Sequence, residues 1–248
     1  MNGIKGILFD FGGTLDTNGT HWGIMLQEAY REVGFSLEDK IFREIYVQGE
    51  RQLAAQPVIA TNDTFREVLQ KKLAIELDYG VTHGFLSDNT DTRNRMALIA
   101  EKCYATARDH IDGIRPLLKK LHNDYRLALV SNFYGNLSAV LDDFDLKNCF
   151  DTVIESACVG IRKPSPAIFS LALDTLQLSP AEAIVVGDSY KNDIAPALSL
   201  GITPVWLKGR GWNDKDDLNS APYIISDFHD LTTLLSVSYT HLTLPTIR

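Results

Sequence analysis

The chain has 248 residues, of which 45% are hydrophobic and 23% are charged, and its formal net charge is -8. This composition is ordinary for a globular protein, and the length allows one large domain or a core domain that carries an insertion. An acidic chain disfavours general binding to nucleic acid, although a local cluster of cations can still hold a small anionic substrate. There is neither a signal-peptide pattern nor an apolar stretch of membrane-spanning length, so we expect a cytoplasmic protein without a membrane partner.

Short apolar runs bounded by turn residues predict the buried strands of a sheet. These runs are Ile4–Phe11, Arg126–Val130, Thr152–Glu155, Ile184–Val186, Thr203–Leu207 and Tyr223–Ile225. Helical patterns lie between the later runs, for example at Ile114–Leu121 and Ala167–Leu176. Strands that alternate with helices predict an α/β fold with a parallel sheet covered on both faces.

The stretch from residue 18 to residue 112 has a different pattern. It contains no convincing strand, and its apolar residues recur at helical spacing in stripes that begin near Trp22, Ile41, Phe65 and Met96. Stripes of this kind pack a small helical bundle. We therefore expect residues 18–112 to form a helical domain inserted into a core made of residues 1–17 and 113–236.

The end of the chain has a separate origin in our interpretation. Residues 237–246 read Val-Ser-Tyr-Thr-His-Leu-Thr-Leu-Pro-Thr, which resembles a translated sequencing-library adapter. We interpret residues 237–248 as a non-native tail and exclude them from the expected fold. The native sequence would then depart from this one after about Ser236.

Polar clusters follow the predicted strands at the points where ligands bind in open α/β sheets, beyond the carboxyl ends of the strands. The clusters are Asp10 with Gly12, Gly13 and Thr14; Ser131 with Asn132; Arg162 with Lys163; and Gly187, Asp188 and Ser189 with Asp193. Together they supply carboxylates, a hydroxyl and an ammonium group. This combination suits covalent phosphoryl transfer, in which a carboxylate attacks phosphorus while cations screen the two anions from each other.

Each cluster has a candidate role in that chemistry. Asp10 and Asp188 supply the hard oxygen ligands that Mg²⁺ prefers, and Lys163 supplies a point charge beside the phosphoryl oxygens. The Ser131 hydroxyl can donate to one of those oxygens, and glycines allow backbone N–H groups to approach a phosphate closely. The candidate substrate-binding residues are Gly13, Thr14, Ser131 and Asn132.

Four segments of the chain resemble the ordered motifs of the haloacid dehalogenase superfamily. They are Phe9–Leu15, Leu129–Asn132, Arg162–Pro164 and Val186–Asp193. The expected helical insertion also follows the first motif, where that family places its cap domain. The resemblance implies a Rossmann-like core with an α-helical cap, and a magnesium-dependent phosphatase that hydrolyses a small phosphorylated metabolite through a phospho-aspartate.

The resemblance also assigns roles to single residues. Asp10 corresponds to the nucleophile, Ser131 holds the phosphoryl group and Lys163 screens charge. The metal ligands are Asp10, Asp188 and the Gly12 carbonyl, and Asp193 supports either the metal or Lys163.

One position departs from the family pattern. Phosphatases of this superfamily usually carry a second aspartate two residues after the nucleophile, as an acid and base, and here that position is Gly12. Three interpretations follow: a phosphatase in which another group handles the proton, a relative that cleaves a carbon–halogen or phosphonate bond, or a phosphate-binding module with low turnover. The phosphonate-cleaving relatives use a cap lysine, for which Lys40, Lys71, Lys72 and Lys102 are candidates. The Gly187-Asp188 pair favours phosphate-monoester hydrolysis, because the dehalogenases lack it.

His21 and Trp22 follow the first motif, where the helical insertion begins. They could face the substrate, but for these residue types we expect Trp22 to pack in a core and His21 to face solvent. The sequence does not identify the substrate or the oligomeric state.

Overall fold

The computed structural model describes residues 1, 3–55, 57–212 and 221–236, so the adapter-like residues 237–248 lie outside the described part. At its centre is a six-stranded sheet in the order β3-β2-β1-β4-β5-β6, and each neighbouring pair of strands is parallel. The predicted α/β fold with a parallel sheet is therefore confirmed. β1 lies between β2 and β4, so that Phe9 is opposite both Leu129 and Val186.

The strands agree closely with the predicted apolar runs. They are β1 (Gly6–Phe9), β2 (Arg126–Ser131), β3 (Thr152–Glu155), β4 (Ala183–Gly187), β5 (Thr203–Leu207) and β6 (Tyr223–Ile225). β1 is shorter than the predicted Ile4–Phe11 at both ends. At its carboxyl end the reason is a tight turn, in which the backbone carbonyl of Phe11 accepts hydrogen bonds from the N–H groups of Thr14 and Leu15.

Each face of the sheet has its own core, because successive side chains of a strand point to opposite faces. Ile7 and Phe9 belong to the core that α4, α5 and α9 cover, and Leu8 belongs to the core that α7 and α8 cover. These helices are α5 (Leu137–Asp143), α7 (Ala167–Leu176), α8 (Ala195–Ser199) and α9 (Asp230–Ser236), with α4 bounded below. The remaining short elements are α6 (Ser156–Val159), η1 (Lys147–Cys149), η2 (Pro180–Glu182) and the π-helical turn η3 (Tyr190–Ile194).

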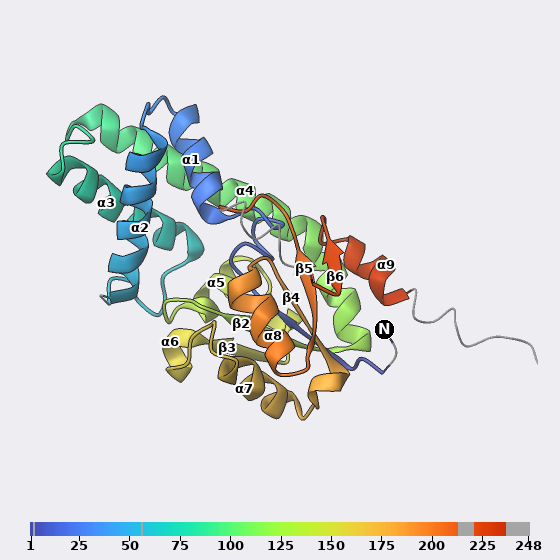
Figure 1. The fold of residues 1–248 in the computed structure, drawn as a ribbon. Coiled ribbons are helices and arrows are strands. Elements are labelled where there is room, and N and C mark those ends of the chain that lie inside the picture. The colour runs from blue at the N-terminus through green and yellow to red at the C-terminus, as the bar shows by residue number, and fades with distance from the viewer. Residues whose placement is uncertain (2, 56, 213–220, 237–248) are drawn as a thin grey trace, which may run out of the picture.

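Residues 22–124, which we call the helical segment, contain α1 (Trp22–Glu32), α2 (Asp39–Ala55), α3 (Phe65–Thr82) and α4 (Thr90–Asp124). Side-chain hydrogen bonds define where two of these helices begin. Thr64 and Glu67 form a capping box at the start of α3, and the Asn89 side chain accepts a hydrogen bond from the Thr92 N–H at the start of α4. The 35-residue helix α4 runs without a break from α1–α3 to the sheet (Figure 1). The expected domain boundary between residues 112 and 113 lies inside this helix.

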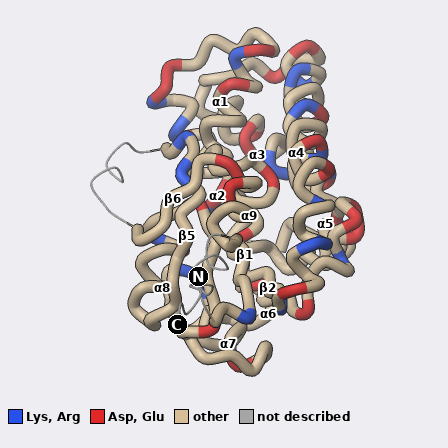
Figure 2. The backbone as a smooth tube through the Cα atoms, turned by 90° about the vertical axis from the view of Figure 1, so that its right-hand side faces the viewer, with Lys and Arg blue, Asp and Glu red and all other residues tan. Residues whose placement is uncertain are grey.

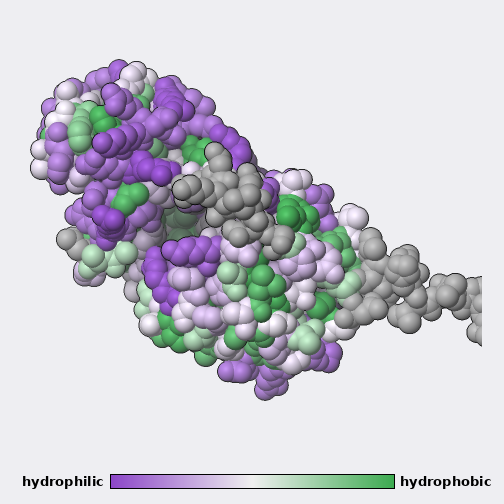
Figure 3. Space-filling view, viewed as in Figure 1, coloured by the Kyte–Doolittle hydropathy of each residue, from purple (hydrophilic) through white to green (hydrophobic). Residues whose placement is uncertain are grey.

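The surface of the molecule is uneven in shape and mixed in charge. In Figure 3 it is hollowed between the helical segment and the part that contains the sheet. Figure 2 shows Lys and Arg interspersed with Asp and Glu along α4, so this helix presents mixed charge rather than one sign. No helix within the described ranges is both long and apolar enough to cross a membrane.

Candidate active site

The carboxyl ends of β1, β2 and β4 bring the predicted motifs together at one edge of the sheet. Asp10 follows β1, Ser131 ends β2 and Asp188 follows β4. The Ser131 hydroxyl donates a hydrogen bond to Asp10 Oδ1 over 3.1 Å. The side chains of these three residues therefore converge because the three strands are neighbours in a parallel sheet.

Lys163 connects two of the carboxylates. Its Nζ atom lies 2.7 Å from Asp10 Oδ1 and 2.7 Å from Asp193 Oδ1, and only 4% of the residue is exposed. Burial by itself would lower the pKa of Lys163, but the charges of Asp10 and Asp193 outweigh burial and raise it. The ammonium group is thus held charged beside Asp10.

Asn132 fixes the loop that carries Lys163. Its side-chain N–H donates to the Lys163 carbonyl over 3.0 Å, and its Oδ1 atom accepts from the Lys163 N–H over 2.9 Å. The amide group of Asn132 is therefore occupied by backbone partners, although the residue also lines the cavity around Asp10. This geometry gives Asn132 a positioning contact that the sequence did not indicate.

Three carboxylates, of which those of Asp10 and Asp193 are buried, form the group that could hold a metal. One oxygen each from Asp10, Asp188 and Asp193 lie within 4.8 Å of one another. Burial, and then the charges of Asp10 and Asp193, raise the pKa of Asp188 well above its ordinary value. Thr14 donates to Asp188 Oδ1 over 3.3 Å. Asp193 is more fully engaged, because its Oδ2 atom also accepts from the Ser189 N–H over 3.1 Å.

The two loop glycines have different environments. Gly13 has a φ of +90°, and a Cβ atom on it would lie 2.4 Å from Asp188 Oδ2. A Cβ atom on Gly12 would meet nothing within 4 Å, and its φ lies outside the left-handed region. Gly13 is thus required by close packing, whereas Gly12 has room for a side chain.

Asp16 is a site residue that the sequence analysis missed. It is fully buried, and its two oxygens accept hydrogen bonds from the Gly13 N–H over 2.7 Å and from Trp22 Nε1 over 2.8 Å. Burial raises the pKa of Asp16 to about 7, although the hydrogen bonds from Trp22 and Gly13 lower it. Its place six residues after Asp10, in the same loop, is the one signal that could have indicated it.

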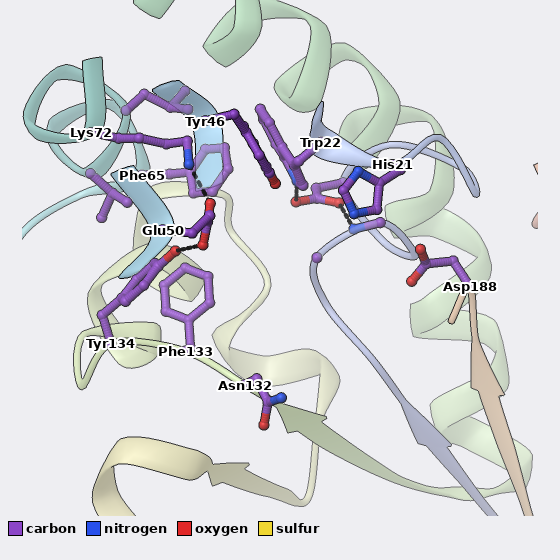
Figure 4. A pocket seen from close by; sticks show the side chains of 15 residues that line it. His21, Trp22, Tyr46, Glu50, Phe65, Lys72, Asn132, Phe133, Tyr134 and Asp188 are labelled. Atoms are coloured by element: carbon purple, nitrogen blue, oxygen red, sulfur yellow. Dashed lines mark hydrogen bonds and ion pairs between the residues drawn. The ribbon is translucent and has the colours of Figure 1, made fainter. Parts of the chain in front are cut away.

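Two adjoining cavities lie at this edge. The first, which we call the catalytic cavity because it contains the candidate nucleophile Asp10, has a volume of about 210 Å³. It is lined by Asp10, Gly12, His21, Ser131, Asn132, Arg162, Lys163, Asp188, Ser189 and Asn192. The second, which we call the chamber, has a volume of about 200 Å³. It is lined by Gly12, Gly13, Asp16, His21, Trp22, Tyr46, Glu50, Phe65, Val68, Leu69, Lys72, Asn132, Phe133, Tyr134 and Asp188 (Figure 4).

Both His21 and Trp22 line the chamber, and His21 lines the catalytic cavity as well. The expectation that His21 faces solvent was therefore wrong, whereas Trp22 packs against the hydrophobic core as expected and lines the chamber as well. The ring of His21 is covered because it packs edge-on against Trp212, with 5.0 Å between the ring centroids. Trp22 is held at the chamber because its Nε1 atom donates to Asp16. Trp212 is remote in the chain from His21, so residue type does not reveal their contact.

The comparison with protein families matches residues 4–201 to the haloacid dehalogenase-like hydrolases. The chain belongs to this family. It is accordingly a hydrolase, and the Rossmann-like core that the motifs implied is the core of a haloacid dehalogenase-like fold.

Curated relatives of this haloacid dehalogenase-like hydrolase include several phosphatases. N-acylneuraminate-9-phosphatase of Mus musculus is 28% identical over 68% of this chain and 77% of the relative. Glyceraldehyde 3-phosphate phosphatase of Pyrococcus furiosus is 36% identical over 50% of this chain and 54% of the relative. Haloacid dehalogenase-like hydrolase domain-containing protein 3 of Bos taurus is 25% identical over 60% and 68%.

Solved structures of the family share the fold at low sequence identity. A HAD-hydrolase from Bacillus subtilis bound to magnesium has a TM-score of 0.55 and 19% identity, and the match covers 94% of this chain and 99% of that one. L-2-haloacid dehalogenase from Xanthobacter autotrophicus has a TM-score of 0.58 and 16% identity over 94% and 98%. Identities this low show a common fold and nothing about the substrate.

Proposed function

We propose that the chain is a magnesium-dependent phosphatase that hydrolyses a small phosphorylated molecule through a phospho-aspartate on Asp10. The observation that carries the proposal is the contact of Lys163 Nζ with both Asp10 and Asp193, next to the carboxylate of Asp188. A buried ammonium group beside a carboxylate lowers the repulsion between that carboxylate and a phosphoryl group. The phosphatases among the relatives support the same reaction class.

The chemistry proceeds in two displacements. A carboxylate oxygen of Asp10 attacks phosphorus, the bond from phosphorus to the ester oxygen breaks, and the departing alkoxide takes up a proton from water and leaves as the alcohol. Water then attacks the acyl phosphate, releasing inorganic phosphate and restoring the Asp10 carboxylate. Ser131 and Lys163, which both contact Asp10 Oδ1, are placed to donate to the phosphoryl oxygens.

The carboxylates fit a magnesium ion. Asp10, Asp188 and Asp193 are hard oxygen donors crowded together, and Asp10 and Asp193 are buried, so their like charges oppose one another unless a cation compensates them. We assign Asp10, Asp188 and the Gly12 carbonyl as ligands, with Asp193 as support because its oxygens already accept from Lys163 and Ser189. When bound, the ion supplies positive charge that offsets the negative charge on the phosphoryl group.

We assign residues 18–112, which contain α1–α3 and the first part of α4, as a cap. The chamber lies between its helices α2 and α3 and the loop after β1, directly beside the catalytic cavity. A phosphoryl group in the catalytic cavity would direct its ester oxygen and leaving group toward the chamber. Gly13 and Thr14 then lie where the two cavities meet. Gly13 lines the chamber, and the Thr14 hydroxyl donates a hydrogen bond to Asp188.

Gly12 leaves the proton of the leaving group without its usual donor. His21 lines both cavities, but its Nδ1 atom accepts a hydrogen bond from the Gly23 N–H over 3.0 Å, so the neutral ring carries its proton on Nε2. Burial lowers the pKa of His21 to about 4, so near neutral pH the ring is a hydrogen-bond donor rather than an acid. We infer that esters with good leaving groups react fastest.

The test is phosphate release from p-nitrophenyl phosphate and from unactivated phosphate esters by the full chain, with Mg²⁺ or with excess EDTA. We expect activity with Mg²⁺, inhibition by beryllium fluoride, and loss of activity in Asp10→Asn and Asp188→Asn proteins that remain folded. The matched control is Asp174→Asn, since Asp174 is an exposed aspartate on α7. Full activity in EDTA would favour the dehalogenase alternative. Binding of phosphate without turnover of any ester would favour the phosphate-binding module.

A further inference from the structure

The charges on the chamber wall are unevenly distributed. Its ionisable side chains, among the described residues, are Asp16, His21, Glu50, Lys72 and Asp188. Burial lowers the pKa of His21 to about 4 and raises that of Asp16 to about 7, and Asp188 is a proposed ligand of Mg²⁺. Glu50 and Lys72 are therefore the charged groups of the described wall that remain to contact a leaving group. The rest of the wall is largely aromatic and aliphatic (Figure 4).

The one ammonium group of the wall is already neutralised. Lys72 forms ion pairs with Glu50 and, over 3.5 Å, with Glu76, and only 4% of the residue is exposed. Its Nζ atom also lies 4.3 Å from the ring centroid of Tyr46. Glu76 is fully buried and accepts a hydrogen bond from the Tyr30 hydroxyl over 2.8 Å. Lys72 therefore has little positive charge to offer a ligand.

Glu50 keeps acceptor capacity toward the chamber. Its side chain is 37% exposed, and besides Lys72 it accepts one hydrogen bond, from the Tyr134 hydroxyl over 3.1 Å. A carboxylate has about four lone-pair positions, so Glu50 can accept further N–H or O–H groups from a ligand. Asp16 cannot do so in the same way, because it is fully buried and both of its oxygens accept from protein donors.

We propose that the chamber selects phosphate esters whose leaving group is neutral and hydroxylated or carries an amine cation, and rejects esters whose leaving group carries a carboxylate. This inference rests on the proposed phosphatase function. Glu50 accepts the hydroxyl or ammonium group of the ligand, and the rings of Trp22, Tyr46 and Tyr134 favour a cation over an anion. A ligand carboxylate would instead meet the carboxylate of Glu50, and the one ammonium group among the described residues that line the chamber, that of Lys72, is already paired.

Two pairs of esters test the proposal directly on the full chain with Mg²⁺. Glycerol 3-phosphate and 3-phosphoglycerate differ by a hydroxymethyl group in place of a carboxylate. Phosphoethanolamine and phosphoglycolate differ by an aminomethyl cation in place of a carboxylate. We expect kcat/KM to be at least about tenfold higher for the first member of each pair. The reason is that the repulsion between two unit charges in a partly buried site changes the activation free energy by an amount equivalent to at least about tenfold in rate. Equal or faster hydrolysis of both carboxylated members would overturn the proposal.

Glu50→Gln examines the residue that carries the argument. It removes one partner of Lys72 and leaves an ammonium charge at the wall, so the preference between the members of each pair should fall by about tenfold or reverse. The ratio is taken within one protein, which cancels any general loss of activity. The control is Glu44→Gln: Glu44 lies on the same helix and also accepts from a tyrosine hydroxyl, that of Tyr79 over 2.8 Å, but it does not line the chamber. If the kcat/KM ratio within each pair of esters is the same for Glu50→Gln as for Glu44→Gln, Glu50 does not select the leaving group.

Failure of the phosphatase function would be seen separately, as absence of p-nitrophenyl phosphate hydrolysis by the wild-type protein. In that case the affinities of the same four esters for the Asp10→Asn protein, measured by calorimetry, still test the charge preference. The wild-type panel and this binding series require no substitution in the chamber. The proposal can therefore be tested even if the Glu50→Gln protein does not fold. Tighter binding of the carboxylated esters would contradict it.

Discussion

Gly13 and Asp188 approach so closely that a Cβ atom on Gly13 would lie 2.4 Å from Asp188 Oδ2. They follow neighbouring strands, β1 and β4, and the absence of a side chain at residue 13 lets the loop after β1 pack against the carboxylate. The contact joins the loop that carries the proposed nucleophile, Asp10, to the proposed metal ligand.

Gly13→Ala should therefore lower both stability and activity. Alanine at a φ of +90° is strained by about 1–3 kcal/mol, and its methyl group would displace the Asp188 carboxylate. We expect a lower midpoint of thermal unfolding and weaker Mg²⁺ binding by calorimetry. Gly12→Ala is the control for the unfolding midpoint, because a Cβ atom there meets nothing within 4 Å. Equal midpoints for the two variants would show that the close contact is not maintained.

Gly12→Asp should restore an acid and base at the position where phosphatases of the family carry one. General acid–base catalysis contributes ~10²–10⁴-fold, and we expect the variant to recover at least about tenfold in kcat on an unactivated ester. The gain should be smaller on p-nitrophenyl phosphate, whose leaving group needs no proton. A side chain at residue 12 can be accommodated, because a Cβ atom there meets nothing within 4 Å. An unchanged ratio of the two rates would mean that another group already supplies the proton.

Gly23→Ala should detach Trp212 from the helical segment. A Cβ atom on Gly23 would lie 1.1 Å from an atom of the Trp212 ring, which is stacked on Tyr46 with 4.8 Å between the ring centroids. Gly23→Ala and Trp212→Ala should each raise KM several-fold, and the double variant should resemble either single variant, because both changes remove the same contact. Measuring KM for the wild type, the two single variants and the double variant tests this expectation. Additive effects of the two changes on KM would contradict it. Gly113→Ala, in open space within α4, serves as the glycine control.

His21 should make the protein less stable in mild acid. Its folded-state pKa of about 4 lies below its ordinary value of 6.5, so between these values the unfolded chain takes up a proton that the folded chain does not. The stability is fully present above pH 6.5 and is lost as the pH falls toward 4. His21→Asn keeps a side chain that can cap α1 but does not titrate. Between pH 7 and pH 5 we expect wild type to lose up to about 2 kcal/mol more unfolding free energy than the variant, measured by urea denaturation. Parallel pH profiles of the two proteins would refute this.

Much of the site was predictable because it depends on short segments at the ends of strands. Asp10, Ser131, Lys163 and Asp188 were each indicated by the chain around them, and a parallel sheet brings the ends of its strands to one edge whatever the details of packing. The direct contacts among Asp10, Ser131 and Lys163 agree with that expectation. Asp193 likewise contacts Lys163, one of the two partners that the resemblance allowed for it.

The chamber was not predictable, because its polar residues are charged side chains on amphipathic helices. In sequence Glu50 and Lys72 resemble ordinary exposed charges, and Lys72 was one of four lysines that no motif distinguished. Glu50 also accepts from Tyr134, which is 84 residues away in the chain. Helical periodicity states which face of a helix is apolar, but it does not state which other element covers a charge.

The sequence by itself determined the fold family, the order of the strands along the chain and the residues that surround the expected nucleophile, since these depend on local patterns and motif spacing. Only the tertiary structure decided that Gly12 has room for a side chain, that Asp16 and His21 belong to the site, and that Lys72 is neutralised by two glutamates. These properties depend on the distances between elements that are remote in the chain. Such distances follow from the packing of the whole core rather than from any one segment.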